Sequence, residues 1–406
     1  MSRLFEKNTR FVPLKTDKKT QENDHIISQA SFVCKNCGSD LVFSPESQDL
    51  RCRNCGNHYP INIPEEEIHE YDFEQAVHEL SRLRHNSSND RRISVIHCPS
   101  CGADFSFKKT EHAGECPYCA TPVVASTAEA RFIIPRSLLP FRIEKKQAIE
   151  IFDEWIGSRW FAPSSLKDHS KRDEKLIGIY LPYWTYDSQT YSQYRGQRGM
   201  TYYDRQVYTT VINGRRVQQV RMVPRIRWTP VAGQVSVHFD DVLIGATKTL
   251  PRTIIDHLQP WDLENLVPYS EQFISGFRSE IYQVTVDQGF LQAENVMERT
   301  IRQHIRYDIG GDHQRISAIN TQHENTSFKH VLLPVWSAAF KYHGKTYRYV
   351  INGRNGTIQG ERPYSMIKIS IAVIAAIAVM LALLFVMQQQ GVFNGSGSGF
   401  IQINTF

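Results

Sequence analysis

Residues 34–55 read CKNCGSDLVFSPESQDLRCRNC, and residues 98–119 read CPSCGADFSFKKTEHAGECPYC. Each stretch holds two Cys-x-x-Cys pairs with fourteen residues between them, and the second stretch repeats the first at an offset of 64 residues. Two thiolates three residues apart in a tight turn can point at one cation, and a second such turn brought back by a β-hairpin completes a tetrahedron. The repeat therefore predicts two small metal-binding modules.

We expect each module to be a zinc ribbon with one structural zinc ion: the first cysteine module over residues 31–62 and the second cysteine module over residues 94–126. The predicted ligands are all eight cysteines of the chain, Cys34, Cys37, Cys52, Cys55, Cys98, Cys101, Cys116 and Cys119. Gly38, Gly56 and Gly102 each follow a cysteine, where the turn often needs a positive φ. A module this short has few ways to bury a core, so the metal should supply most of its folding free energy.

Other cysteine chemistries fit the pattern less well. Disulfides need an oxidising compartment, and residues 1–30 form a polar arm without the apolar segment of a secretory signal. A redox Cys-x-x-Cys pair normally begins a helix and does not come as matched sets. Iron in a four-thiolate site stays open as an alternative. Catalytic zinc is disfavoured because four cysteines leave no open position, and His58, His97 and His112 are not needed as ligands.

A second decisive stretch lies near the C-terminus, where residues 369–387 read ISIAVIAAIAVMLALLFVM. Nineteen residues at ~1.5 Å each span about 28 Å, close to the hydrocarbon thickness of a bilayer. A buried helix of that length would normally show a polar stripe, and none is visible. We therefore expect one transmembrane helix over residues 366–388.

Charge predicts the orientation of this helix. Arg354, Arg362 and Lys368 precede it, whereas residues 389–406 form a tail without a charged side chain. The positive-inside rule then places the N-terminal bulk in the cytoplasm and the short tail outside, as a single-pass protein of the inner (cytoplasmic) membrane. Reduced cysteines agree with that location.

Residues 63–93 are expected to form a helical spacer and linker between the modules, with a helix over 63–85. Its apolar face would hold Ile68, Phe73, Val77, Leu80 and Leu83. Residues 130–363 are expected to form the main α+β domain, with a mainly antiparallel sheet. Periodicity predicts two amphipathic helices in it. The first lies near 145–157 and the second near 291–306, where Val296, Met297, Ile301 and Ile305 make the apolar side.

The strand signals of this domain are local. Asn213-Gly214 separates two strand-like runs, which is the strongest short hairpin signal. Leu181-Pro182-Tyr183-Trp184 and Leu333-Pro334-Val335-Trp336 are two similar motifs that suggest two related β units. His343-Gly344-Lys345-Thr346 ends like a phosphate-binding loop, but its strand-like flanks favour a hairpin turn.

No catalytic motif emerges from the chain. Asp240 and Asp241 are adjacent, and neighbours in a regular strand point to opposite faces, so we expect them not to converge. Gly310-Gly311-Asp312 is typical of a helix C-cap followed by a turn. No residue is therefore assigned a catalytic role, and an enzyme of unknown chemistry stays the weakest alternative.

The formal net charge of +5 is concentrated in one segment. Residues 201–230 hold six arginines and a single acid. We call residues 205–227 the arginine-rich hairpin. Arg221, Arg225 and Arg227 are spaced by even numbers and should share one face of a regular strand, unless Pro224 disturbs it. Such a surface can be a solvated strand face, can contact anionic lipid or protein, or, with the nearby tyrosines, can hold single-stranded nucleic acid.

Several stretches, with the paired cysteine modules, resemble a bacterial family of zinc-ribbon single-pass membrane proteins. They are Leu139-Pro140-Phe141, Trp160-Phe161-Ala162-Pro163, Leu181-Pro182-Tyr183-Trp184, Pro260-Trp261-Asp262-Leu263, Gly276-Phe277-Arg278, residues 308–312 and Gly360-Glu361-Arg362-Pro363. Members are often labelled TFIIB-type zinc-ribbon proteins or primosomal or superfamily II helicase-like proteins. Some are similar to YdjG-type proteins, which are associated with membrane-stress proteins. The chain has no nucleotide-binding loop, so helicase activity is not carried over.

Two functions from different classes follow. The first is a non-enzymatic membrane-anchored adaptor or scaffold whose zinc ribbons dock protein partners. The resemblance implies that such a partner is a peripheral membrane-stress protein. The second is a membrane-tethered nucleic-acid-binding protein, which predicts binding that weakens steeply with salt.

Overall fold

The computed structural model describes residues 32, 34–39, 41–63, 68–86, 96–97, 102–105, 113–115, 118, 122–124, 133, 135–158, 176–212, 215–280, 282–342, 345–361 and 365–389. The predicted N-terminal arm, the tail from residue 390 onward, and Cys98, Cys101, Cys116 and Cys119 lie outside the described residues. The same holds for His112 and for the stretch Trp160-Phe161-Ala162-Pro163.

One large, mainly antiparallel sheet organises the described part of the chain, which confirms the predicted α+β class. Its main path runs β11 (Arg215–Gly245), β10 (Ile177–Ile212), β14 (His313–Tyr342), β15 (Lys345–Asn352) and β16 (Ile358–Gly360), and each neighbouring pair is antiparallel. Four short strands join this sheet away from the main path. They are β4 (Tyr71–Asp72), β9 (Ser137–Leu138), β12 (Val267–Pro268) and β13 (Arg278–Ser279).

The hairpin predictions are confirmed by the register. Ile212 lies opposite Arg215, with only Asn213 and Gly214 between them. Tyr342 likewise lies opposite Lys345, so the segment that resembled a phosphate-binding loop joins two antiparallel strands. The two similar motifs also meet, because Leu181 lies directly opposite Leu333 within the one sheet.

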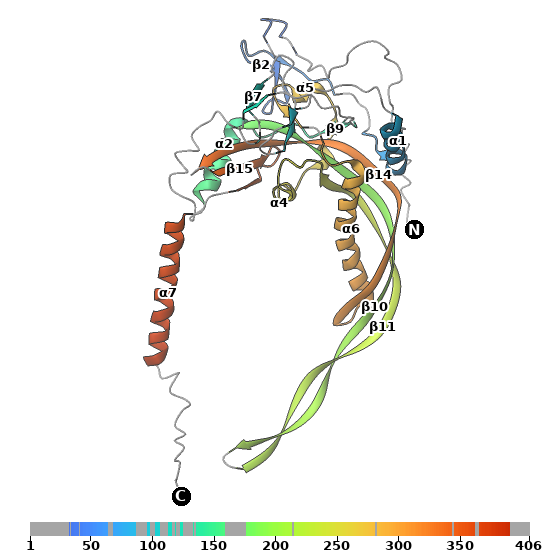
Figure 1. Ribbon diagram of the computed structural model, residues 1–406, viewed down its shortest axis with the longest axis vertical. Coiled ribbons are helices and arrows are strands. Elements are labelled where there is room, and N and C mark those ends of the chain that lie inside the picture. Colours follow the sequence, from blue (N-terminus) through green and yellow to red (C-terminus); the bar gives the residue numbers. More distant parts are fainter. Residues whose placement is uncertain are drawn as a thin grey trace.

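Strand β10 is too long to stay flat, and both of its neighbours carry an irregularity at the same level. The register of β10 with β11 shifts between Tyr186 and Ser188, and that with β14 shifts between Asp187 and Gln189. Asp241 on β11 and Asn325 on β14 have positive φ angles of 53° and 50° there, as in bulges that bend a sheet. The three strands arch away from the body below this point (Figure 1).

The helices pack mainly where periodicity placed them. Helix α2 (Lys145–Gly157) confirms its prediction and buries Ala148, Phe152 and Ile156. Helix α6 (Val286–Ile309) is longer than predicted, and it ends at Gly310 (φ 66°), which confirms the C-cap. Val296 was wrongly placed on its apolar side and is 37% exposed, whereas Met297, Ile301 and Ile305 are buried. Helices α4 (Arg252–Asp256) and α5 (Glu271–Ile274) and a 3-10 turn (Leu263–Asn265) are short.

The spacer helix was predicted to begin too early. Helix α1 spans Phe73–Asn86, and β4 precedes it, with Tyr71 opposite Phe328 of β14. The long-range pairing of Tyr71 with the main sheet overrides local helix propensity before Phe73. Phe73, Val77 and Leu80 pack against the core beneath α6, whereas Ile68 lies outside the helix. The spacer is therefore attached to the main domain.

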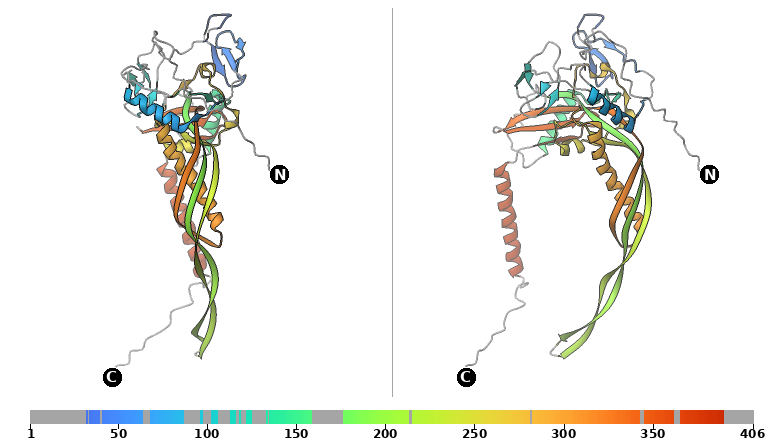
Figure 2. Two further views of the ribbon diagram at one scale, coloured as in Figure 1. Left: turned by 90° about the vertical axis from the view of Figure 1, so that its right-hand side faces the viewer. Right: turned by 45° about the vertical axis from the view of Figure 1, so that its right-hand side comes forward.

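The two cysteine modules pack on opposite faces of the central sheet. Successive strand residues point to opposite faces. Leu41, Phe43 and Leu50 of the first module join a core that contains Tyr180 and Leu332. Ala103, Phe105 and Tyr118 of the second join the core of the neighbouring residues Ile179, Leu181, Val331 and Leu333. The sheet thus separates the modules, which both lie at one end of the molecule (Figures 1 and 2).

Helix α7 (Met366–Gln389) extends from the opposite end of the body (Figure 1). Its segment Lys368–Val386 is long and apolar enough to cross a membrane, and none of that segment is buried against the rest of the protein. Large apolar side chains such as Val379 and Phe385 are 61% and 62% exposed. Water is a poor environment for such a surface, and a bilayer is a good one.

Candidate metal centre

The first cysteine module is built from two matching turns on a small antiparallel sheet. Strands β1 (Leu41–Ser44), β2 (Asp49–Cys52) and β3 (His58–Tyr59) make the sheet, and the β1–β2 hairpin brings the second cysteine pair back to the first. In one turn the Gly38 N–H donates to the Cys34 carbonyl (2.9 Å), and in the other the Gly56 N–H donates to the Cys52 carbonyl (3.0 Å). Gly38 and Gly56 have φ angles of 74° and 76°, which confirms the predicted positive φ.

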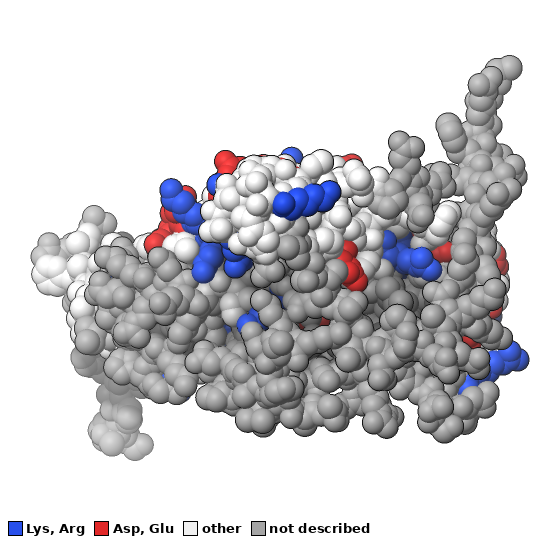
Figure 3. Space-filling view, turned by 90° about the horizontal axis from the view of Figure 1, so that it is seen from above, with Lys and Arg blue, Asp and Glu red and all other residues white. Residues whose placement is uncertain are grey.

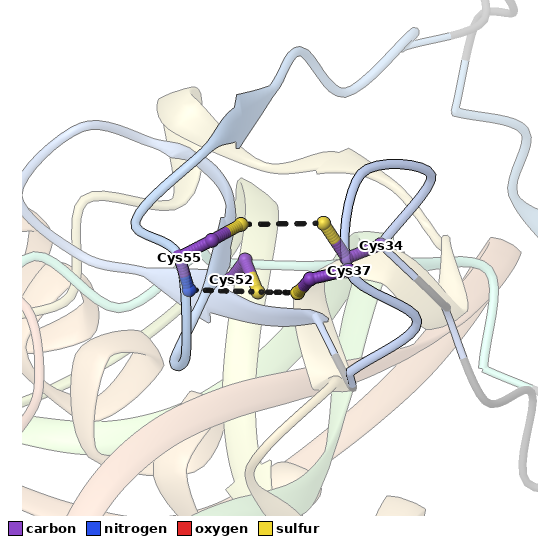
Figure 4. Close-up of side chains that lie close together, drawn as sticks. All are labelled: Cys34, Cys37, Cys52 and Cys55. Atoms are coloured by element: carbon purple, nitrogen blue, oxygen red, sulfur yellow. Dashed lines mark hydrogen bonds between the residues drawn. The ribbon is translucent and has the colours of Figure 1, made fainter.

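The four sulfur atoms of this module converge (Figure 4). The Cys34 and Cys55 Sγ atoms lie 3.6 Å apart, those of Cys37 and Cys52 lie 3.5 Å apart, and all four are within 4.8 Å of one another. Four sulfurs at 2.3 Å from a central zinc ion would be separated by about 3.8 Å at the corners of a tetrahedron. A disulfide needs about 2.05 Å between sulfurs, so the arrangement fits a shared cation and not two disulfides.

The surroundings of Cys34 and Cys37 favour thiolates, the form that binds metal. In contrast, a hydrogen bond from the Asn57 backbone is outweighed by burial and the three neighbouring sulfur atoms, which raise the pKa of the Cys55 thiol to about 11. The Tyr59 hydroxyl contacts the Cys34 Sγ (3.3 Å) and lowers the pKa of that thiol. Hydrogen bonds from Ser39 lower the pKa of the Cys37 thiol to about 6. The Cys55 N–H also donates to the Cys52 Sγ (3.5 Å). Cys34, Cys37, Cys52 and Cys55 can therefore hold one metal ion.

His58 is not part of this group. Its Nδ1 lies 2.8 Å from the Asp49 carboxylate, on the neighbouring strand β2. The four cysteines can fill all positions of a tetrahedral site. His58 is therefore not needed as a ligand, as the sequence analysis expected.

The described flanks of the second module repeat the first at the same offset. The Leu41 N–H donates to the Phe32 carbonyl in the first module, and Ile96 pairs with Phe105, 64 residues later, in the second. Gly102 has a φ angle of 72°, matching Gly38. Strands β5 (Ile96–His97) and β6 (Asp104–Phe105) flank one cysteine pair, and β7 (Ala113–Glu115) and β8 (Pro122–Val124) flank the other. These two short hairpins lie where the predicted cysteine turns of the second module would need them.

A second group of potential ligands corrects the prediction for Asp240 and Asp241. Carboxylate oxygens of Asp187, Asp240 and Asp241 lie within 4.8 Å of one another. The expectation that the adjacent aspartates diverge assumed a regular strand, and the bulge at Asp241 breaks that alternation. Asp187 also accepts the Asp241 N–H (2.7 Å).

A lysine already forms ion pairs with this acidic group. The Lys329 Nζ lies 2.7 Å from the Asp241 Oδ1 and 3.0 Å from the Glu70 Oε1, and its side chain is nearly buried. Ser327 donates a further hydrogen bond to Glu70. The ammonium group thus compensates negative charge at Asp241, and its second contact ties the spacer residue Glu70 to the sheet.

This network predicts a pH dependence of stability. Burial and the Glu70 carboxylate raise the pKa of Asp187 to about 8, against 3.8 for an ordinary aspartate. Because the folded state holds the proton more tightly, this group stabilises the fold below about pH 4, and the contribution is lost as pH rises to about 8. Asp187→Asn stays neutral at every pH, so it should raise the melting temperature at pH 8.5 by a few degrees. This shift corresponds to a gain of about 1–2 kcal/mol in the free energy of unfolding, after allowing for the partial exposure of Asp187.

The measurement is thermal unfolding of the detergent-solubilised chain at pH 5.0 and pH 8.5. The variant and the parent should differ little at pH 5.0 and clearly at pH 8.5. Asp240→Asn, on the exposed neighbour, is the matched control and should leave the parent's pH dependence in place. The assignment would be contradicted if the melting temperature of the parent rose from pH 5.0 to pH 8.5. It would also be contradicted if the Asp187→Asn variant were less stable than the parent at pH 8.5.

Comparison with known proteins gives one distant likeness. The chain is 23% identical over 348 residues to a Bacillus subtilis (strain 168) protein named "Uncharacterized protein YdjG", which covers 84% of this chain and 92% of the relative. The likeness to a YdjG-type protein is therefore confirmed at the level of a distant relative. No protein-family model matches the chain, and no solved structure matches it.

Proposed function

We propose that the chain is a membrane-anchored adaptor on the cytoplasmic face of the inner membrane. Two structural zinc ions, one in each cysteine module, hold the modules as docking surfaces for protein partners. Helix α7 crosses the bilayer once, with the modules in the cytoplasm. The observation that carries the proposal is the seating of the first module, a four-sulfur centre packed rigidly on the domain at the end remote from α7.

Zinc is the metal that this centre suits best. Four thiolates in a closed tetrahedron are typical of structural zinc, whereas a catalytic ion keeps an open position. Iron can also bind four thiolates, and the metal content of the purified protein distinguishes the two. A second ion follows from the repeat, since the same spacing and the same flanking hairpins recur around Cys98, Cys101, Cys116 and Cys119.

The first module is fixed to the body by both packing and hydrogen bonds. The Phe43 ring lies 5.3 Å from that of Phe273, and the Phe43 N–H donates to the Ser275 carbonyl (2.9 Å). The Gln48 side chain donates to the Phe141 carbonyl (2.7 Å) on the main domain. A docking surface held this way loses little conformational entropy when a partner binds.

The outer side of the module is available to a partner. Cys34 and Cys52 are buried, whereas Lys35, Asn36 and Arg53 of the two turns are exposed. Seen from this end, basic, acidic and uncharged side chains are interspersed on the described surface (Figure 3). A mixed surface of this kind suits protein contact, while nucleic acid favours a continuous basic patch.

The membrane location in this proposal is supported by helix α7 and by the charged residues that flank it. Its apolar segment has the length of a bilayer, Arg354, Arg362 and Lys368 precede it, and the tail from residue 390 carries no charged side chain. The length of α7 supports a single crossing, and the charge distribution supports an orientation with the domain and the modules on the cytoplasmic side. The modules then lie at the end of the body remote from the bilayer, where they are accessible to cytoplasmic or peripheral proteins.

The nucleic-acid alternative finds less support in the arginine-rich hairpin. Two of the nearby tyrosine rings already have a guanidinium group over one face, with Arg221 over Tyr208 (5.5 Å) and Arg227 over Tyr202 (5.2 Å). A base that stacks on either of these faces would have to displace the guanidinium group. We therefore favour protein docking, with a peripheral membrane-stress protein as the partner that the family resemblance implies.

The test compares partner recovery from bacterial membranes. The full-length tagged chain is cross-linked in cells and solubilised in detergent, and co-purified proteins are identified by mass spectrometry. Cys34→Ser/Cys52→Ser should abolish recovery of the specific partner while the chain stays in the membrane fraction. The surface variant Lys35→Glu/Arg53→Glu, which retains every cysteine, should reduce recovery with the metal still bound.

Glu46→Gln, an exposed change in the β1–β2 turn of the same module, is the matched control and should leave recovery unchanged. Equal partner recovery by the parent chain and the cysteine variant would contradict the adaptor proposal. Salt-sensitive binding of DNA or RNA by the full chain, with no specific protein partner, would favour the second function instead.

A further inference from the structure

The two cysteine modules are attached to the body through different surfaces. The first module is attached through its β1–β2 hairpin, where the Gln48 side chain donates to the Phe141 carbonyl (2.7 Å). Its two cysteine turns, residues 34–37 and 52–55, approach each other around the four sulfur atoms (Figure 4). We call these two turns the turn face of the first module.

The second module uses a corresponding turn to contact the body. Tyr118 is the third residue of the turn that begins at Cys116, and its side chain is only 1% exposed. The Tyr118 hydroxyl donates a hydrogen bond to the Glu280 carboxylate (3.0 Å), which is itself buried. The hydroxyls of Thr247 and Thr249 donate to the same carboxylate. A cysteine turn of this chain thus docks on a carboxylate of its own main domain.

The turn face of the first module is exposed at the equivalent positions. Asn54 corresponds to Tyr118, since the two modules repeat at an offset of 64 residues. Both Asn54 and its neighbour Arg53 are exposed, as are Lys35 and Asn36 of the other turn. The surface that the second module buries against the body is therefore open to another protein in the first.

The composition of the turns agrees with this difference. The turns of the second module read CPSC and CPYC and are uncharged, whereas those of the first read CKNC and CRNC. Uncharged turns suit a buried contact, because an unpaired charge is costly to remove from water. Lys35 and Arg53 instead give the turn face two positive charges, and within the described residues neither side chain forms an ion pair.

We infer that the turn face of the first module binds an acidic segment of a partner protein, while the body itself occupies the corresponding face of the second module. An arginine binds a carboxylate through two parallel hydrogen bonds, and a lysine adds a compact positive charge nearby. The contact between Tyr118 and Glu280 is an instance, within this chain, of a cysteine turn that binds a carboxylate. This inference rests on the proposed function and restricts its partner to a protein with aspartate or glutamate at the contact.

Nucleic acid is also anionic but fits the turn face less well. Two basic side chains neutralise few phosphates, whereas a nucleic-acid-binding surface has a basic patch or stripe that follows the backbone. The exposed Glu46 of the same module would repel a longer polyanion. An acidic protein segment is therefore the ligand that this surface favours.

The arginine-rich hairpin is a larger basic surface of the same chain and provides the control. Its register runs without a shift past Pro224, so this proline does not disturb the pairing. Arg221, Arg225 and Arg227 therefore share one face, as predicted. A partner attracted by positive charge alone would bind there, whereas a partner that recognises the turn face would not.

The experiment uses a water-soluble carbodiimide, which joins a lysine amine to a carboxylate in direct contact with it. Lysed cells that express the full-length tagged chain are treated with this reagent, the chain is purified in denaturant, and the joined residues are identified by mass spectrometry. We expect an amide between Lys35 and an aspartate or glutamate of one other protein. Arg53→Gln should lower the yield of this link roughly tenfold or more, because a charge-assisted hydrogen bond is lost while the Lys35 amine remains.

Two further variants test whether the position of the charge matters. Arg53→Lys keeps the charge, so it should retain the link at Lys35 and add a second link at residue 53. Arg221→Gln removes the same charge from the arginine-rich hairpin and should leave the yield at Lys35 unchanged. An unchanged yield in Arg53→Gln, or an equal loss in Arg221→Gln, would overturn the inference.

The outcomes separate this inference from the proposed function. If no protein is recovered with the parent chain after formaldehyde cross-linking, the adaptor proposal and this inference both fail. If recovery of a partner requires Cys34 and Cys52 and yet no carbodiimide link forms at Lys35, the inference alone fails. A Lys35 link that disappears after nuclease treatment of the lysate would identify nucleic acid as the anionic ligand, which overturns the inference as well.

Discussion

Replacing Cys34 and Cys52 with serine should lower the zinc content of the chain by one ion and unfold the first cysteine module. The module has strands of four, four and two residues, and its buried side chains are few. Zinc binding to modules of this kind contributes about 10–16 kcal/mol of apparent free energy, far more than so small a core can supply. Cys34 and Cys52 are the buried pair among the four cysteines, so the double variant should lose the metal and would leave polar hydroxyls in the core.

The measurement is zinc per chain together with limited trypsin digestion of the detergent-solubilised protein. Lys35, Arg51 and Arg53 lie in the module, and cleavage there should become fast in the variant. Ser47→Ala, an exposed position in the β1–β2 turn, is the control and should keep the parent's zinc content and resistance. An unchanged zinc content in the double variant would rule out these cysteines as ligands.

A second large effect is expected from charge in the middle of α7. Ile377→Arg/Leu381→Arg places two arginines one turn apart in the apolar segment. Each costs about 2.5–3.5 kcal/mol at the centre of a membrane helix, so insertion loses about 5–7 kcal/mol in all. The chain should move from the carbonate-resistant membrane fraction to the soluble fraction or be released by carbonate.

Leu291→Arg is the matched control for this change. Leu291 is 62% exposed on α6, so the same substitution there leaves α7 intact and the chain in the membrane. Carbonate-resistant membrane association of the α7 variant would contradict a crossing by this helix.

The sequence was most informative where a few neighbouring residues determine the geometry. The spacing within residues 34–55 predicts the four-sulfur group, because the two tight turns and the intervening hairpin are local structures. Asn213-Gly214 predicts the hairpin for the same reason. Gly310 after a periodic apolar run predicts the end of α6.

It was least informative where distant segments decide the outcome. The convergence of Asp187 with Asp240 and Asp241 depends on a bulge in β11, and period-two alternation cannot foresee it. The strand at Tyr71 exists because β14 pairs with it, although the sequence there predicts a helix. The placement of the cysteine modules on opposite faces of the sheet likewise follows from side-chain alternation at Tyr180 and Leu181, which is visible only once the sheet is known.

The apolar segment of α7 and the pairing of the arginine-rich hairpin differ in how they could be found. The apolar segment of α7 is evident from composition alone, since nineteen consecutive residues lack a charge. Which residues of the arginine-rich hairpin share a face is known only from the register, which pairs Val207 with Val220. A strand's face is defined jointly with its partner, so single-strand patterns underestimate it.

The account depends most on metal bound by the cysteines, and elemental analysis of the freshly purified full-length chain tests this directly. The protein would be solubilised and purified in detergent without chelator and analysed by mass spectrometry of its elements against protein concentration. We predict two zinc ions per chain and no stoichiometric iron. A chain that is folded and free of metal, or one that carries iron in place of zinc, would contradict the account.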